Sequence, residues 1–233
     1  MIPLRDKNPS GIVPVIVYLL IAANAAIFLL EVAMPEEDLM EMAMRFGMVP
    51  EKITLALRGE GNIVTGLAVP SVTSMFLHGG WLHLVGNMWF LFIFGDNVEG
   101  RLGHLRFLLF YVFCGLLAGL TQYALGPTVA SPMIGASGAI AGVLGAYAVC
   151  WPQARIVTLV PFFILVLVEL PALVVLGFWF VIQFFKGTAS LGVETAGGGV
   201  AYGAHVGGFL AGALIIWLLP RRKWRSRRPH RPS

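Results

Sequence analysis

Long apolar runs alternate with short polar stretches along almost the whole chain. The first run covers about residues 11–34, and others cover about 80–94 and 104–125, with a polar turn expected over 95–101 between these two. A fourth run begins at Ser137 and stops near Trp151. Apolar runs that approach about 20 residues have the length of a helix that crosses the hydrocarbon core of a bilayer. We therefore expect each of these runs to be a membrane-spanning helix.

The rest of the apolar sequence is interrupted. Residues 156–186 are apolar for longer than one span needs, but two prolines and Glu169 break the run. Since proline ends or kinks a helix, we expect a span over about 170–185, preceded by a re-entrant or interfacial segment. A last span is expected over about 200–219. The pattern predicts an all-α membrane protein, a bundle of six transmembrane helices.

The polar segments divide the chain into three parts. Residues 1–10 are a short polar lead, residues 11–219 form one membrane domain, and residues 220–233 are a basic tail. Within the membrane domain, a polar and amphipathic loop covers 35–70, and a glycine-rich loop covers 187–199. The first apolar run is too long for the hydrophobic region of a signal peptide, so we expect it to be an uncleaved span.

Composition excludes an ordinary soluble domain, because 58% of the residues are hydrophobic and 12% are charged. The loop cations concentrate on the side that the two termini share, which predicts cytoplasmic termini and a multi-pass protein of the cell membrane. The basic tail supplies much of the net charge of +4, and we expect it to fix the topology and to attract anionic lipid. No pattern indicates nucleic-acid binding, a metal site or a cofactor. Cys114 and Cys150 are expected to be buried small hydrophobes.

Polar residues occur at one depth in three of the predicted spans. His83 and Asn87 lie in the first part of one span, Ser137 opens another, and His205 lies about one turn into the last. In the predicted topology all three helices run from outside to inside, so these side chains lie near the outer ends. Polar side chains at membrane depth usually face a bundle interior or a water-filled cavity. The shared depth indicates one shared site.

The spacing of these residues adds detail. His83 and Asn87 are four residues apart, so they share a helix face. Small residues recur at the same spacing on two spans: Gly138 and Gly142 on one, Gly208 and Gly212 on the other. Such faces let helices approach closely, which would bring Ser137 within hydrogen-bond reach of His205. A base in contact with a serine is what activates this nucleophile. Each feature alone has a structural explanation, but the combination at one depth does not.

These residues belong to motifs. The motifs are His83-Leu84-Val85-Gly86-Asn87, Gly135-Ala136-Ser137-Gly138, and Ala204-His205-Val206-Gly207-Gly208 with Gly212. On these motifs, the core of the chain resembles the rhomboid family of intramembrane serine proteases. The segment Glu99-Gly100-Arg101-Leu102-Gly103 resembles the family's structural turn, and His78 its additional upstream histidine. Glu99 and Arg101 are expected to pair with each other and to order this turn.

The resemblance implies a role for each residue of the site. Ser137 would be the nucleophile and His205 the base, as a dyad without an acid. The side chains of His83 and Asn87 and the backbone N–H of Ser137 would stabilise the oxyanion. Gly135 would let the backbone lie close to that oxyanion site.

One position departs from the family pattern. Four residues after the nucleophile, several relatives carry an aromatic ring that packs on the catalytic histidine, whereas this chain has Ala141. We expect Tyr202 or a group of the second span to orient His205 instead. The resemblance also implies that loop 35–70 is membrane-embedded and that loop 187–199 is a mobile cap over the site.

The resemblance implies a serine endopeptidase that cleaves single-span membrane proteins within or near their transmembrane segments, through an acyl-enzyme. Small residues at the cleavage site and helix-weakening residues below it would mark the substrate. Two alternatives remain. An inactive relative that binds clients without cleaving them typically lacks the serine or the histidine, and both are present here. A small-solute transporter or channel would have inverted internal repeats, which the sequence does not show.

Overall fold

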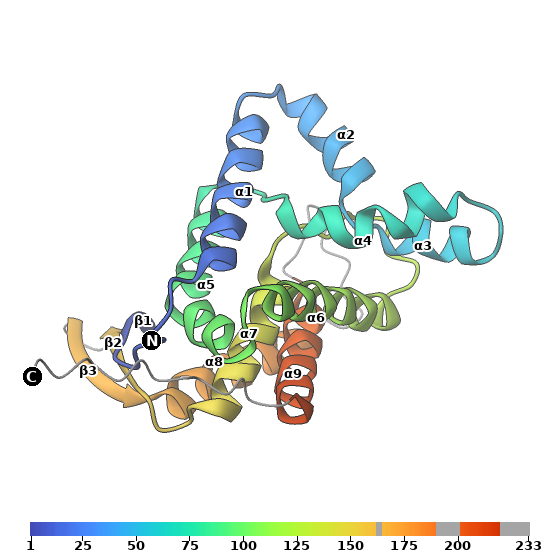
Figure 1. The fold of residues 1–233 in the computed structure, drawn as a ribbon. Helices are drawn as coiled ribbons and strands as arrows, with labels where there is room; N and C mark the ends of the chain where they lie inside the picture. Colours follow the sequence, from blue (N-terminus) through green and yellow to red (C-terminus); the bar gives the residue numbers. More distant parts are fainter. Residues whose placement is uncertain (162–164, 190–200, 220–233) are drawn as a thin grey trace, which may run out of the picture.

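The computed structural model of this chain describes residues 1–161, 165–189 and 201–219. The basic tail at 220–233 and most of the glycine-rich loop predicted at 187–199 lie outside these described residues. The described chain is mostly helical, with a small sheet at one end (Figure 1). The prediction of an all-α protein is therefore wrong in one respect, because three strands accompany the helices.

Three of the described helices are long and apolar enough to cross a membrane. They are α1 (Val15–Val32), α6 (His104–Leu125) and α8 (Ala172–Ala189). Only 17% to 33% of the residues in their apolar windows are buried, so most of their apolar side chains face outward. Water would oppose this exposure, whereas lipid tails are as apolar as the side chains themselves. These are the helices of a membrane protein.

Helix α5 (Trp81–Leu102) is longer than the sequence pattern predicted. We expected the span to end near residue 94 and a polar turn to follow over 95–101, but this segment is helical. Two of its polar side chains are bonded inside the fold: Asn97 bonds to the N-terminal segment, and Glu99 bonds to the start of α1. The helix ends at Gly103, whose φ of 81° lies in the region that glycine adopts without strain.

The segment between α1 and α5 is folded into short helices. These are α2 (Glu36–Phe46), α3 (Pro50–Leu57), the π-helix η1 (Val64–Ala68), α4 (Pro70–Thr73) and the 3₁₀ helix η2 (Ser74–Phe76). None of the residues of α2 is buried. Met48 pairs with Met133 in an isolated β-bridge, and the Ser74 carbonyl oxygen accepts a hydrogen bond from Gly135 N at 2.8 Å. The segment therefore supports the loop that leads to Ser137.

The sheet has the order β1-β2-β3 and is antiparallel throughout. Its strands are β1 (Ile2–Asp6), β2 (Arg155–Pro161) and β3 (Leu165–Pro171). The prediction of a re-entrant or interfacial segment before α8 is thus replaced by a hairpin, formed by a stretch rich in the β-branched residues that favour strands. The remaining strand, β1, comes from the polar lead at residues 1–10. Lys7, which follows β1, forms an exposed ion pair with Glu169 of β3.

Helix α7 (Ser137–Cys150) packs in the middle of the bundle, against α9 (Tyr202–Leu218), α6 and α5. Its contact with α9 is made by the predicted glycine faces. A Cβ on Gly208 would lie 2.1 Å from the carbonyl oxygen of Gly138, and a Cβ on Gly212 would lie 1.9 Å from that of Gly142. Only a residue without a side chain allows this approach, which also brings the first turns of α7 and α9 together.

Candidate active site

Ser137 and His205 meet at the N-terminal ends of α7 and α9. Ser137 is the first residue of α7, and His205 lies one turn into α9. Their Oγ and Nε2 atoms are 2.7 Å apart, which is a hydrogen bond. His205 is buried, whereas Ser137 is half-buried. The hydroxyl is thus held against the imidazole and keeps an open side.

The other ring nitrogen of His205 bonds to a side chain that the sequence analysis did not single out. Nδ1 lies 2.8 Å from Oε1 of Gln183 on α8. The ring also contacts Trp179, with centroids 5.8 Å apart, and Tyr202, edge-on at 6.2 Å. Tyr202 therefore contacts His205, but the hydrogen bond to the ring comes from α8. An amide within an otherwise apolar span was the signal available in the sequence.

His83 and Asn87 converge on the backbone that precedes Ser137. Gly79 N donates to His83 Nδ1 over 3.4 Å, which leaves Nε2 of His83 as the ring donor. A Cβ on Gly135 would lie 2.6 Å from that Nε2 and 3.7 Å from Nδ2 of Asn87. Gly135 has a φ of 123°, where a side chain would be strained. Glycine therefore lets two side-chain donors approach the backbone two residues before the serine.

His78 also bonds to Asn87. Nδ2 of Asn87 donates to Nε2 of His78 over 3.0 Å. The backbone N–H of His78 faces both carboxylate oxygens of Glu31 on α1, each at 3.2 Å. His78 and Asn87 are both buried. Glu31 lies inside the first apolar run, and the sequence analysis gave it no role.

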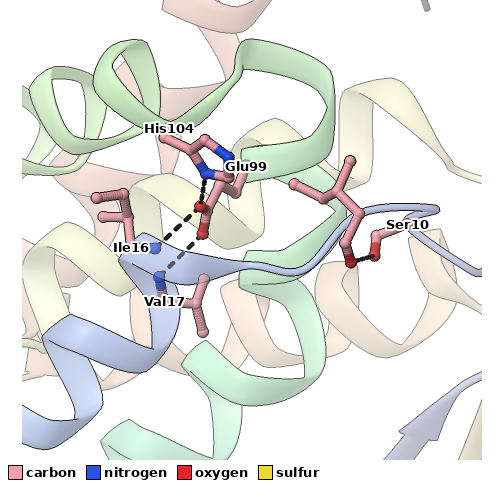
Figure 2. Close-up of polar contacts among 6 residues, drawn as sticks. Ser10, Ile16, Val17, Glu99 and His104 are labelled. Atoms are coloured by element: carbon pink, nitrogen blue, oxygen red, sulfur yellow. Dashed lines mark hydrogen bonds and ion pairs between the residues drawn. The ribbon is translucent and has the colours of Figure 1, made fainter.

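Glu99 and Arg101 have separate partners, contrary to the prediction that they pair. Figure 2 shows the Glu99 carboxylate at the start of α1, where it accepts hydrogen bonds from Ile16 N and Val17 N at 2.9 Å each. Its Oε1 also lies 2.5 Å from Nδ1 of His104. A carboxylate at a helix N-terminus satisfies free N–H groups and the positive end of the helix dipole.

Arg101 reaches the opposite kind of helix end. Its Nη2 donates to the carbonyl oxygen of Ile216 in the last turn of α9, over 3.3 Å. Residues two apart on a helix point in different directions, which explains why Arg101 and Glu99 bind different helices. Both lie near the end of α5, whereas His83 lies near its start, about 24 Å away at 1.5 Å per residue. They brace the bundle and are not part of the Ser137 site.

The arrangement suits acyl transfer to a serine. His205 can accept the Ser137 proton, and the imidazole of His83 and the amide of Asn87 face the position beside the serine. A helix N-terminus adds free backbone N–H groups at that point. Donors that surround a nucleophile in this way stabilise negative charge on a carbonyl oxygen.

Comparison with known proteins agrees with the motifs. A family model described as the rhomboid domain matches residues 67–222. Rhomboid-like protein 11, chloroplastic, of Arabidopsis thaliana is 32% identical over 161 residues, which cover 64% of this chain and 52% of that protein. Rhomboid protein 1, mitochondrial, of Saccharomyces cerevisiae is 31% identical over 165 residues, covering 67% and 44%.

A third relative is the putative rhomboid protease YdcA of Bacillus subtilis. It is 38% identical over 76 residues, which cover 33% of this chain and 38% of that protein. The chain therefore spans about half or less of the length of these curated relatives.

Proposed function

Since the chain belongs to the rhomboid family, we propose that it is an intramembrane serine endopeptidase with Ser137 as nucleophile and His205 as general base. The observation that carries this proposal is the 2.7 Å contact between Ser137 Oγ and His205 Nε2. A serine hydroxyl is a weak nucleophile unless a base takes its proton. The contact provides that base where two helix ends meet.

In the first half of the reaction, Ser137 Oγ attacks the carbonyl carbon of the scissile peptide bond. Its proton passes to His205 Nε2, and negative charge develops on the carbonyl oxygen. The side chains of His83 and Asn87 and the backbone N–H of Ser137 donate to this oxygen. The C–N bond then breaks, His205 returns its proton to the leaving amine, and an ester on Ser137 remains.

In the second half, water takes the place of the amine. His205 accepts a proton from the water as its oxygen attacks the ester carbonyl carbon. The same donors stabilise the second oxyanion. The C–O bond to Ser137 breaks, the serine recovers its proton from His205, and a carboxylic acid leaves.

The substrates we propose are single-span membrane proteins, cleaved within or near their transmembrane segments. A transmembrane helix satisfies its backbone hydrogen bonds internally, so its carbonyl groups become accessible only where the helix is weakened. Small residues at the cleaved bond would let it approach the partly buried Ser137. The rhomboid resemblance of the three motifs supports this substrate class.

The membrane arrangement we propose has six transmembrane helices: α1, α5, α6, α7, α8 and α9. The termini would lie in the cytoplasm and the protein in the cell membrane, because the cations lie mostly in the loops on that side. The tail at 220–233 would then face anionic lipid.

A reporter fused after Ser233 should indicate the cytoplasm, and a cysteine at position 51 should react with an impermeant reagent from outside. The reverse pair of results would invert the proposed orientation.

The direct test uses purified protein and a generic single-span substrate. Wild type should cleave the substrate and should be labelled at Ser137 by a fluorophosphonate probe. Ser137→Ala should abolish both, while the fold persists. Cleavage by Ser137→Ala at the wild-type rate would remove Ser137 from the mechanism. Absence of both cleavage and labelling in folded wild type would instead favour a protein that binds clients without cleaving them.

A further inference from the structure

Helices α8 and α9 face each other through two side chains from each helix, one of which is His205. Trp179 and Gln183 are four residues apart on α8, and His205 and Phe209 are four residues apart on α9. Residues at this spacing share a helix face. The Trp179 ring lies 5.8 Å from His205 and 6.2 Å from Phe209, stacked on the latter at 30°.

We propose that Gln183 is a positioning residue for His205, which fixes the tautomer and the orientation of the imidazole through the hydrogen bond at Nδ1. This inference rests on the proposed function, because it assigns a role to Gln183 in the activation of Ser137. Gln183 would act through His205 and would not touch the substrate.

The hydrogen bonds of His205 carry the inference. In a neutral imidazole one nitrogen donates and the other accepts. To take the Ser137 proton, Nε2 must be the acceptor, so Nδ1 must carry the hydrogen. Oε1 of Gln183 lies 2.8 Å from Nδ1 and can only accept. The amide oxygen therefore selects the tautomer that leaves Nε2 free for Ser137, which lies 2.7 Å away.

The neighbours of His205 explain why an amide suits this position. Among residues 1–161, 165–189 and 201–219, the side chains that bond to or stack on the imidazole are aromatic or neutral: Trp179, Tyr202, Ser137 and Gln183. A carboxylate would give the same acceptor, but burying a charge at membrane depth is costly. Gln183 supplies an acceptor without that cost. Trp179 covers the ring from the same helix, and position 141 offers only a methyl group.

Two other ionisable groups of the described part of the chain face this region from the elements packed around His205. His83 on α5 interacts electrostatically with His205. Lys186 on α8 lies with Nζ 5.9 Å from the ring centre of Tyr202. From α6, the neutral Gln122 accepts a hydrogen bond from Ala204 N at 3.1 Å. His83 and Lys186 are present in wild type and in every Gln183 variant. A difference between these proteins in the pH dependence of the rate is therefore due to the substitution of Gln183.

The test compares Gln183→Leu, Gln183→Glu and the control Val181→Ala, which lies on the exposed side of the same helix. Gln183→Leu leaves the buried Nδ1–H without a partner, so kcat and the rate of fluorophosphonate labelling should fall roughly five- to hundredfold. KM should stay within about twofold, because the substrate does not touch Gln183. Val181→Ala should keep the wild-type kcat.

Gln183→Glu keeps the acceptor and adds a charge that favours the imidazolium form of His205. It should retain most activity at neutral pH and shift the acid limb of the pH–rate profile to higher pH. This variant decides the question if Gln183→Leu does not fold.

An unchanged kcat in folded Gln183→Leu, with or without a lower melting temperature, would overturn the inference, because the bond would then only tie α8 to α9. An unshifted acid limb in Gln183→Glu would overturn it as well. Both results leave the proposed function intact as long as Ser137→Ala is inactive. Cleavage by Ser137→Ala would refute the proposed function itself.

Discussion

Gly212 of α9 lies directly against the backbone of Gly142 of α7: a Cβ on Gly212 would be 1.9 Å from the Gly142 carbonyl oxygen. The two helices that carry Ser137 and His205 are therefore in backbone contact. A larger residue at position 212 would clash with backbone atoms, and no change of side-chain rotamer could remove that clash. The distance between the serine and the histidine depends on this contact.

We predict that Gly212→Ala lowers both stability and activity. The added methyl group must push α9 from α7, a form of overpacking that costs about 1–3 kcal/mol. Because a displacement of about 1 Å can cost about a hundredfold in rate, kcat should fall by a similar factor. Melting temperature and kcat measured on one preparation check this. Gly177→Ala on α8 is the matched control, since a Cβ there meets nothing within 4 Å, and it should keep full activity.

We predict that Glu99→Leu destabilises the protein without changing the kcat of folded molecules. The substitution removes the acceptor for Ile16 N and Val17 N, and each buried group left unsatisfied costs about 1–3 kcal/mol. The site lies about 24 Å along α5, so its geometry should persist. The melting temperature should fall well below that of Glu60→Leu, the same change at an exposed loop position. A selective loss of kcat at wild-type stability would contradict the bracing role.

The third prediction concerns pH and Asp6, which docks the N-terminal strand. Burial raises the pKa of Asp6 above its usual value of 3.8, and the hydrogen bond from Tyr147 only partly offsets this. The folded state thus binds the proton more tightly than the unfolded state. Stability due to Asp6 is highest below the unfolded pKa, and it falls as pH rises through the folded pKa.

Asp6→Asn should therefore flatten the decrease in melting temperature as the pH rises above the usual Asp pKa of 3.8, while an amide oxygen can still accept from Tyr147. The measurement is a melting curve at several pH values for wild type and variant. Asp38→Asn, at an exposed position of α2, should leave the pH dependence unchanged. A steeper decrease in Asp6→Asn would contradict the direction of the shift.

The approach of Ser137 to His205 could be predicted because it depends on local patterns. Glycines four residues apart define a helix face, and a polar residue at the start of an apolar run defines a depth, so the sequence contains both. The structure places the two side chains 2.7 Å apart across these faces.

The partners of single polar residues could not be predicted in the same way. Gln183 and Glu31 each lie in an apolar helix, and which neighbour they meet depends on how that helix is rotated against others. The hairpin of β2 and β3 was missed for another reason. A short apolar run rich in valine, isoleucine and leucine does not distinguish a strand from a membrane segment by periodicity.

The last prediction separates an oxyanion donor from a structural tie. Nδ2 of Asn87 lies 3.7 Å from the position of a Cβ on Gly135 and 3.0 Å from Nε2 of His78. Its two amide hydrogens can serve both sides. If it donates to charge that develops only in the transition state, Asn87→Ala should lower kcat by roughly ten- to a thousandfold with little change in KM.

His78 provides the comparison, because it bonds to Asn87 and is not one of the proposed oxyanion donors. If Asn87 were only a tie between its helix and His78, then Asn87→Ala and His78→Ala should lower the melting temperature alike and leave kcat unchanged. If Asn87 is an oxyanion donor, Asn87→Ala should lower kcat much more than His78→Ala does, for the same loss of stability. Removing His83 as well should then cost more than either change alone, since the two donors act on one oxygen. In the dyad, by contrast, a second substitution adds little because Ser137 and His205 act as a unit. A lower melting temperature with unchanged kcat in Asn87→Ala would exclude the oxyanion role.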